Sequence, residues 1–215
     1  PGAPFFFKLG IVQLGDTEAK LYLEMVETIT QQPCAAFNFQ FVWTSKPPEE
    51  VKKNFSKVFE ELRVDIPSYG QPRGLSLQKE NVMSLSQASQ KDMIDSFESV
   101  ILLRQCDNMD KIKPSAYMGV VSDSTPHLLA YTGTIDENGM TNVGSAALEY
   151  KFDFFEYVPL GTHLKTKSGV QSMSNKTFVW KHWIFNVETG KPVAIASAVA
   201  AVSYTHLRAH ETFRY

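Results

Sequence analysis

An acidic residue, Asp107, lies between an apolar segment and a predicted helix start. Residues 100–103 before it are apolar, and Pro114 after it has the residue type favoured at the first position of a helix. Aspartate is common in turns and helix caps, so a structural role explains the pattern. A carboxylate beside the free N–H groups of a helix N-terminus could instead act on a reacting carbonyl group. The residues alone leave both roles of Asp107 open.

The other residues with reactive side chains favour structural roles. No histidine can be placed beside Cys106, which favours a buried thiol over a nucleophile. His182 lies in a strand-like segment, where a packed or hydrogen-bonded histidine is more usual than a catalytic one. His163, Lys165 and Lys167 could bind phosphate groups, although a solvated strand face explains them equally well. The sequence has neither a G-x-S-x-G elbow nor a metal-ligand spacing, so a serine hydrolase and a metal site are not predicted.

Composition describes an ordinary globular protein. The chain has 215 residues, of which 43% are hydrophobic and 20% charged, with a net charge of -2. This charge gives no reason to expect nucleic acid as a partner, and no apolar stretch approaches the ~20 residues that span a bilayer. Two cysteines, Cys34 and Cys106, are too few for a disulfide framework or a zinc site. No cofactor is predicted.

Both ends of the sequence lead to expectations about processing. Residues 202–212 read V-S-Y-T-H-L-R-A-H-E-T, which resembles the translation of a transposon-based sequencing adapter. We therefore expect residues 202–215 to form a non-native tail, and we exclude His206 and His210 from any site. The chain begins without Met, so we expect the natural N-terminus and any targeting signal to be missing, with the cytoplasm as the expected location.

Alternating and aromatic segments predict an antiparallel sheet in the second half of the chain. Its strands are expected at residues 100–104, 145–158, 162–172, 177–187 and 192–202. A helix between the first two of these strands should begin at Pro114 and end near Tyr131, with a kink or a division into two helices where residues 122–126 interrupt its pattern. Its apolar stripe should face the sheet; it consists of Tyr117, Val120, Val121, Leu128 and Leu129.

The first half of the chain resembles a partial copy of the second. Residues 7–15, 19–28 and 37–43 match residues 152–161, 162–172 and 178–185 in kind and order, which predicts a repeat. An amphipathic helix is expected within residues 46–66, followed by a linker rich in Ser, Gln, Gly and Pro up to residue 96. The helix should pack through its apolar stripe, which consists of Val51, Phe55, Val58, Phe59 and Leu62.

The order of strand, acidic segment, helix and four strands resembles the hotdog-fold thioesterases of the 4-hydroxybenzoyl-CoA thioesterase type. In that family a strand leads through R-x-x-D-x-M-G-H-V-N-N-x-x-Y into the central helix, and Arg104, Asp107, Met109 and Tyr117 fit this pattern, with Cys106 beside the acid. The segments F-E-Y-V-P-L-G-T and W-I-F-N-V-E-T-G-K-P-V-A resemble later strands of the family. The family's Gly-His-Val-Asn-Asn is replaced by residues 110–114.

The resemblance implies an α+β hotdog fold, with a five-stranded antiparallel sheet around a central helix. Residues 97–201 would form this domain, residues 46–96 a helix and linker, and residues 1–45 the C-terminal half of a first, truncated hotdog. Pairing of hotdog domains within the chain or in a homo-oligomer is expected.

The activity that the resemblance implies is hydrolysis of an acyl-CoA or acyl-carrier-protein thioester. Asp107 would be the catalytic base or nucleophile, and the backbone N–H groups of Lys111 and Ile112 would stabilise the oxyanion. Substrate contacts are expected from Asp110, Lys111, Ile112 and Tyr117. The alternative is a hotdog without catalytic activity that binds acyl groups or serves as a structural module.

Overall fold

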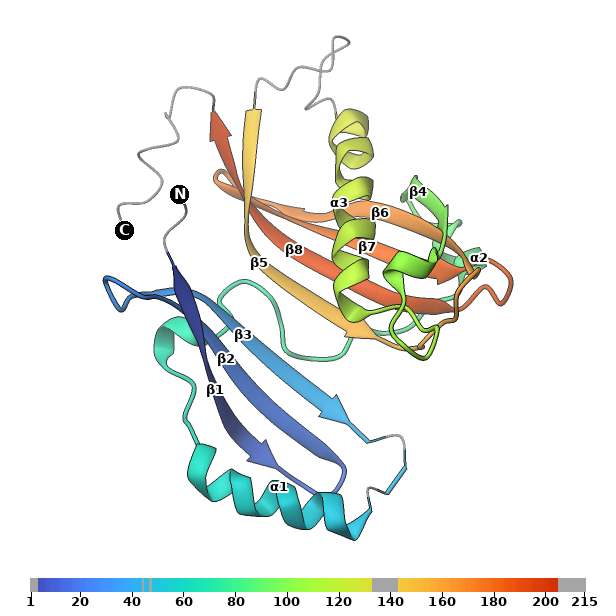
Figure 1. The fold of residues 1–215 in the computed structure, drawn as a ribbon. Coiled ribbons are helices and arrows are strands. Elements are labelled where there is room, and N and C mark those ends of the chain that lie inside the picture. The colour runs from blue at the N-terminus through green and yellow to red at the C-terminus, as the bar shows by residue number, and fades with distance from the viewer. Residues whose placement is uncertain (1–3, 44, 47, 133–142, 205–215) are drawn as a thin grey trace. The chain divides into compact units, whose positions relative to one another are not determined.

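The computed structural model describes residues 4–43, 45–46, 48–132 and 143–204. The chain divides into two compact units, unit 1 (Pro1–Arg73) and unit 2 (Gly74–Tyr215), whose elements are labelled in Figure 1. Within the described residues, no helix is long and apolar enough to cross a membrane.

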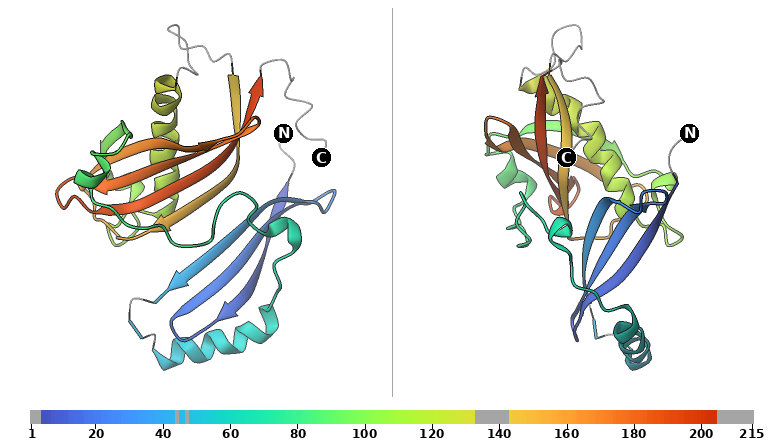
Figure 2. Two further views of the ribbon diagram at one scale, coloured as in Figure 1. Left: turned by 180° about the vertical axis from the view of Figure 1, so that it is seen from behind. Right: turned by 90° about the vertical axis from the view of Figure 1, so that its left-hand side faces the viewer.

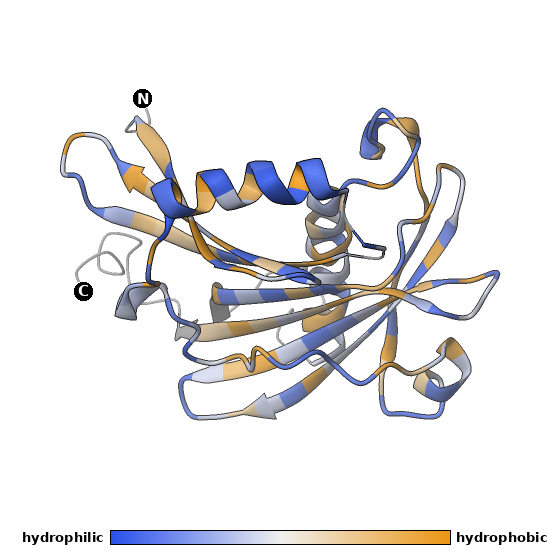
Figure 3. Cartoon of the chain, turned by 90° about the horizontal axis from the view of Figure 1, so that it is seen from below, coloured by the Kyte–Doolittle hydropathy of each residue, from blue (hydrophilic) through white to orange (hydrophobic). Residues whose placement is uncertain are grey.

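Unit 1 is a three-stranded antiparallel sheet with one helix beside it. Its strands β1 (Phe5–Leu14), β2 (Glu18–Glu27) and β3 (Pro33–Val42) pair in sequence order. Helix α1 (Glu49–Leu62) packs beside β1 and carries alternating hydrophilic and hydrophobic stripes (Figure 3). Its apolar stripe is only partly covered, because no residue of α1 is buried. The predicted amphipathic helix is therefore present, but it packs loosely.

Unit 2 is a five-stranded antiparallel sheet curved around one central helix (Figures 1 and 2). The helix, α3, spans Pro114–Tyr131 and begins at the predicted proline. The strand order is β4-β6-β7-β8-β5, so β4 and β5 form the two edges. The strands span Ile94–Val100 (β4), Val143–Phe154 (β5), His163–Met173 (β6), Thr177–Asn186 (β7) and Pro192–Tyr204 (β8). This arrangement confirms the predicted α+β architecture, and the four later strands lie where the sequence predicted them.

The core of unit 2 lies between α3 and the concave face of the sheet. The predicted stripe faces inward: Tyr117, Val120, Val121 and Leu128 are buried, and Leu129 is half-buried. Near the start of α3 the stripe packs on residues of β6, β7 and β8, and near its end on Trp180 and the alanines of β8. Burying this stripe holds α3 along most of its length.

Helix α3 is continuous, and the predicted division into two helices is wrong. Pro126 lies inside the helix and supplies no N–H to the preceding turn. The acceptor that loses its backbone donor is Ser122 O; just before it, Ser124 Oγ donates to Val120 O (2.7 Å) and Thr125 Oγ1 donates to Val121 O (2.8 Å). Because Leu128 beyond the proline is still buried against the sheet, packing keeps the helix in one piece.

The expected strand at residues 100–104 is also wrong. Strand β4 ends at Val100, opposite His163, where β6 begins. Beyond Ile101 the partner chain turns away at Gly161, whose φ is 83°, so no strand remains to pair with. Residues 103–105 form a 3-10 turn instead.

Part of the predicted linker belongs to unit 2. Helix α2 (Leu85–Ala88) has a capping box in which Ser84 and Gln87 exchange hydrogen bonds. Ala88 is fully buried and packs with Trp183 on the outer face of the sheet. At the other end, β8 continues through Tyr204, so residues 202–204 of the predicted tail are in the sheet. The rest of that predicted tail, residues 205–215, lies outside the described residues.

The strands of the two units match in a different alignment from the predicted one. Residues 152–161 cannot correspond to β1, because β1 pairs with β2, whereas β5 pairs with β8. Strands β1, β2 and β3 instead match β6, β7 and β8 at a constant separation. Phe5 pairs with Glu27 as Leu164 pairs with Asn186, and the separation is 159 residues at both positions (164 − 5 and 186 − 27).

Irregularities of the two sheets match at this separation. The register of β1 shifts after Ile11, and that of β6 shifts after Val170. The register of β2 shifts after Met25 against β3, and that of β7 after Ile184 against β8. A β-bulge is a specific local feature of a strand, so bulges at matching positions indicate that the two sheets have the same backbone register.

The connecting turns match as well. In the β2–β3 turn the N–H of Gln31 donates to Glu27 O, and in the β7–β8 turn the N–H of Gly190 donates to Asn186 O. Gln31 and Gly190 both have positive φ, 57° and 65°. The side chains of Glu27 and Asn186 each accept the N–H groups two and three residues later. Unit 1 therefore repeats three strands and a turn of unit 2.

A chain of hydrogen bonds crosses the core side of the sheet. Ser96 Oγ lies 2.5 Å from Ser168 Oγ, which lies 2.6 Å from His182 Nδ1. His182 is fully buried, and burial lowers its pKa from 6.5 to about 4. The neutral imidazole is therefore the form that folding requires.

We predict that His182 destabilises unit 2 in mild acid. Between pH 6.5 and about 4 the unfolded chain binds a proton that the folded chain does not, so stability falls as the pH falls through this window. The loss should approach roughly 3 kcal/mol by pH 4. Denaturant unfolding is followed by fluorescence in a Trp43→Phe background, which limits the signal to the tryptophans of unit 2.

His182→Gln should flatten this pH dependence, while the exposed His127→Gln should leave it as in the parent. If His182→Gln loses as much stability as the parent between pH 6.5 and pH 4, the neutral buried histidine is not its cause.

Candidate functional site

Asp107 lies in a short loop, residues 106–112, which we call the Asp107 loop. After β4 the chain passes through the 3-10 turn of residues 103–105 and then folds back on itself. Cys106 forms an isolated antiparallel bridge with Ile112, and the N–H of Lys113 donates to Gln105 O (2.9 Å). Helix α3 begins at the next residue, Pro114. The loop is therefore clamped at its base immediately before the helix.

The Asp107 side chain caps this loop. Its Oδ1 accepts the N–H groups of Met109 (2.9 Å) and Lys111 (3.0 Å), and its own N–H donates to Lys111 O (2.8 Å). The hydrogen bond from Lys111, followed by that from Met109, holds the pKa of Asp107 below its ordinary 3.8. Within the described part of the chain, Oδ2 accepts no hydrogen bond. The structural role is thus real, and one carboxylate oxygen remains uncommitted.

The segment Val158–Leu160 fixes the loop from the other side. The N–H of Ile112 donates to Val158 O (3.0 Å), and the N–H of Leu160 donates to Asp110 O (2.9 Å). Asp110 has a φ of 56°, a left-handed conformation that aspartate tolerates better than most residues. The P-L-G segment singled out in the sequence therefore packs beside the acidic loop.

The predicted oxyanion donors are engaged elsewhere. The N–H of Lys111 donates to Asp107 and that of Ile112 to Val158, so neither faces a ligand. At the start of α3, Pro114 has no N–H and the N–H of Ala116 donates to Lys113 O (2.9 Å). The second helical residue, Ser115, keeps a backbone N–H without an intrahelical acceptor. Its position directly after the helix-opening proline is the signal that the sequence interpretation missed.

The predicted substrate contacts divide between the surface and the core. Asp110 is exposed and Lys111 is half-buried beside Asp107, so these two share the loop surface with it. Ile112 and Tyr117 are 1% and 2% exposed and belong to the hydrophobic core. The Tyr117 ring packs on Phe154 with centroids 5.4 Å apart, and burial raises the pKa of its hydroxyl. The structure thus brings Asp107, Asp110 and Lys111 together and leaves the other two inside the fold.

The candidate phosphate-binding residues are already paired. His163 Nε2 lies 2.7 Å from Glu98, and Lys165 lies 3.1 Å from Asp95. Lys167 lies 2.6 Å from Asp95 as well. The acids of β4 therefore neutralise these cations of β6, which supports the solvated strand face over the phosphate site.

Cys106 is a buried thiol, as the sequence favoured, and its Sγ lies 3.5 Å from Leu102 O. Across the described residues, no three His, Cys, Asp or Glu side chains come together as a metal site requires.

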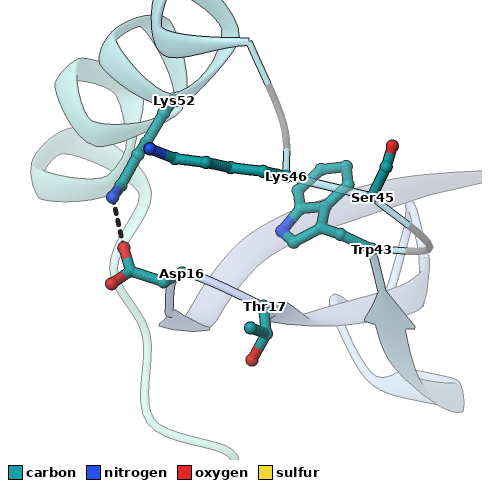
Figure 4. A pocket seen from close by; sticks show the side chains of 6 residues that line it. All are labelled: Asp16, Thr17, Trp43, Ser45, Lys46 and Lys52. Atoms are coloured by element: carbon teal, nitrogen blue, oxygen red, sulfur yellow. Dashed lines mark ion pairs between the residues drawn. The ribbon is translucent and has the colours of Figure 1, made fainter.

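A pocket of about 420 Å³ lies in unit 1, far along the chain from the Asp107 loop (Figure 4). Two lysines line it, but Lys52 pairs with Asp16 and Lys46 lies 3.2 Å from Glu49. Its cations are therefore compensated. A second, shallower pocket of about 270 Å³ lies in unit 2, and none of its lining residues belongs to the Asp107 loop. The second pocket is lined by Ser122, Thr125, Pro126, Ser145, Ala147, Tyr150 and Trp180.

No family model matches the chain, and no curated protein matches its sequence. Solved structures that resemble it are hotdog-fold thioesterases. A probable thioesterase from Bartonella henselae has 13% identity and a TM-score of 0.45, covering 54% of this chain and 95% of that one. YbaW, a probable thioesterase from Escherichia coli, has 14% identity and a TM-score of 0.46, covering 53% and 85%.

Slr0204, a 1,4-dihydroxy-2-naphthoyl-CoA thioesterase from Synechocystis, has 14% identity and a TM-score of 0.45, covering 52% of this chain and 82% of that one. At such identities and TM-scores neither an activity nor a substrate is transferred to this chain. The strand order β4-β6-β7-β8-β5 around the central helix α3 is itself the hotdog arrangement, and unit 2 has this fold.

Proposed function

We propose that unit 2 is a thioesterase that hydrolyses acyl-CoA or acyl-carrier-protein thioesters with Asp107 as the reacting carboxylate. One observation carries this proposal. The Asp107 carboxylate is oriented by two backbone N–H groups, while its second oxygen is uncommitted directly before the start of α3. The cap uses Oδ1 alone, so Oδ2 is free to react with a bound thioester.

The lowered pKa of Asp107 favours attack over proton transfer. Above pH 3.8 the carboxylate is ionised and ready to act as a nucleophile, whereas a group of such low pKa is a weak general base. In the proposed reaction Oδ2 attacks the thioester carbonyl carbon and the C–S bond breaks, so that the thiolate leaves and takes a proton from solvent. Water then hydrolyses the resulting anhydride and releases the acid and the Asp107 carboxylate.

The N–H of Ser115 is our proposed oxyanion donor. It takes the place of the predicted Lys111 and Ile112 donors, whose N–H groups are engaged. The N-terminal end of α3 adds the positive end of the helix dipole, which favours negative charge developing on the carbonyl oxygen.

Basic residues around the loop support an anionic carrier. Lys111 contributes an attractive charge to the Asp107 carboxylate, and Lys113 Nζ lies 3.1 Å from Arg104 O. Arg104, Lys111 and Lys113 therefore surround the base of the loop with positive charge, although Asp110 offsets part of it. The phosphate groups of coenzyme A and of a carrier-bound phosphopantetheine share the chemistry that such residues attract.

The alternative function is an acyl-binding or structural hotdog without catalysis. It is favoured by the engaged N–H groups of Lys111 and Ile112, which leave fewer donors than a preformed oxyanion site would have. Acyl-CoA binding by calorimetry without turnover on short, medium or long acyl chains would support this alternative and reject the thioesterase.

We predict that Asp107→Asn lowers the kcat/KM for acyl-CoA hydrolysis by ~10²-fold or more, because loss of the nucleophile should cost at least as much as loss of a positioned catalytic base. The amide keeps the size and the Oδ1 acceptor but removes the charge and the nucleophile. Release of free coenzyme A with a thiol reagent measures the rate. Asp123→Asn is the matched control, since it changes an exposed acid outside the Asp107 loop and should keep most of the activity.

Replacement of Ser115 by proline tests the oxyanion donor. Proline in the first turn of a helix breaks no intrahelical hydrogen bond, but it removes the N–H of residue 115. We expect a loss of ~10²-fold or more in kcat, the scale of a missing oxyanion donor. Ser115→Ala keeps the N–H and should hydrolyse thioesters like the parent. Equal rates for the two variants would reject this donor, and circular dichroism checks that the helix is kept.

The structural role of Asp107 has its own prediction. In Asp107→Ala the N–H groups of Met109 and Lys111 lose their acceptor, and their hydrogen exchange should accelerate relative to both the parent and Asp107→Asn. A variant that is catalytically silent but keeps slow exchange at these two positions separates catalysis from loop capping. Unchanged exchange in Asp107→Ala would show that the cap is not needed to order the loop.

A further inference from the structure

The face of unit 1 that corresponds to the α3-binding face of unit 2 is apolar and uncovered. In unit 2, Leu164, Ile184 and Ala194 pack with the first half of α3, and alternation places the residues two positions along each strand on the same face. At the 159-residue separation, these positions fall on apolar residues of β1, β2 and β3. We call the exposed members the aromatic face; they are Phe5, Phe7, Leu9, Phe37, Phe39 and Phe41.

Each member of the aromatic face is between 40% and 56% exposed. The opposite face of the same sheet is covered along β2, where Tyr22 and Val26 are buried and a Cβ on Gly70 would lie 2.8 Å from the Tyr22 ring. The centre of one side of the unit 1 sheet is thus covered by its own unit, while the other side presents a set of large, exposed apolar side chains. A soluble domain rarely leaves such a surface free unless something binds there.

The aromatic face is more apolar than the corresponding face of unit 2. In unit 2, three positions on the corresponding face are polar: Thr166, Ser168 and His182. Ser168 and His182 share a hydrogen bond, and Thr166 is buried. Their counterparts in unit 1 are Phe7, Leu9 and Leu23, which can only be satisfied by apolar contact. The common backbone therefore carries a purely hydrophobic surface in unit 1.

Both edges of the unit 1 sheet are open in the places where unit 2 is complete. Strand β4 pairs with β6, and β5 pairs with β8. In unit 1, β1 corresponds to β6 and β3 corresponds to β8. Both β1 and β3 are edge strands, and no described strand pairs with the outer side of either. The chain after α1 reaches the outer side of β1 only at its far end, where the N–H of Val64 donates to Ile11 O (3.1 Å).

We propose that the aromatic face and the two open edges of unit 1 bind a strand–helix–strand segment of the β4–α3–β5 type, which completes a second hotdog. In unit 2 this segment, β4–α3–β5, precedes β6, so by the same element order we expect the occupant to be joined on the N-terminal side of β1. Its helix lies across the aromatic face, and its two strands pair with the outer sides of β1 and β3. The proposal is independent of the thioesterase activity, because only strand register and burial enter it.

The shape of the face constrains the helix of this occupant. Opposite the second half of α3, unit 2 has Ala198 and Ala200, which pack with Leu128. Unit 1 has Phe39 and Phe41 at these positions. Large side chains on the strand require small ones on the helix, since cores are filled to nearly constant density. A helix with α3's own bulky stripe does not fit, and the occupant helix should present Gly, Ala or Ser there.

Thiol labelling tests the occupant. Two proteins are compared, the 215-residue chain and a longer form of it in which the proposed segment precedes Pro1. Both carry Cys34→Ser, because Cys34 is exposed while Cys106 is buried. Phe39→Cys places the probe on the aromatic face. Gln40→Cys is the matched control. Gln40 follows Phe39 in β3, so its side chain points to the opposite face of the sheet, where it is exposed.

We expect maleimide to label Phe39→Cys rapidly in the 215-residue chain and at least tenfold more slowly in the longer protein, with Gln40→Cys labelled equally in both. Equal labelling of Phe39→Cys in the two proteins would overturn the proposal. If Phe39→Cys is already labelled slowly in the shorter chain, and its protection from maleimide increases with protein concentration, the proposal is overturned in favour of a second copy. Hydrogen exchange of β1 and β3 in the unsubstituted proteins provides a second readout, with slower exchange expected only in the longer one.

Discussion

Unit 2 depends on the burial of one helix in the concave face of one curved sheet. Helix α3 supplies a stripe that is almost completely buried, and the sheet supplies the complementary surface from β6, β7 and β8. This single contact explains why Pro126 does not divide the helix, since packing on both sides of the proline outweighs one missing backbone hydrogen bond. It also explains why a fully buried His182 must stay neutral, because the same surface that packs α3 excludes water from the imidazole.

The position of Asp107 follows from that packing. Because α3 is fixed on the sheet, its first residues are fixed too, and the Asp107 loop is held between them and residues 158–160. The hydrogen bonds that order the loop also lower the pKa of Asp107, so the geometry that orients the carboxylate makes it a weak base. Orientation and basicity therefore oppose each other at this position. A nucleophilic role reconciles them, because attack requires an ionised oxygen and no proton.

Local patterns in the sequence predicted the strands and the helix but not the partners of individual groups. Alternation placed β7 and β8 well, and the apolar stripe placed α3, because each reports which side of an element is buried. Strand β4 was misplaced, since the pairing with β6 decides where it ends. Tyr117 was expected both to face the sheet and to contact substrate, and its burial satisfies only the first expectation. The N–H of Ile112 could not be assigned from sequence, because its acceptor Val158 lies 46 residues further along the chain (158 − 112).

The match between the two units also shows where residue types alone give the wrong alignment and strand register gives the right one. Aromatic strands resemble one another, so similarity in kind aligned β1 with β5, whereas bulges and turn hydrogen bonds align it with β6. At the same separation, β1, β2 and β3 correspond to β6, β7 and β8, and no described residue of unit 1 corresponds to the Asp107 loop. The two units also differ in side chains where their strands match in register. Ser168 and His182 carry a hydrogen bond across unit 2, and their counterparts Leu9 and Leu23 carry none, so the shared register specifies the sheet while the side chains specify what each sheet must bury.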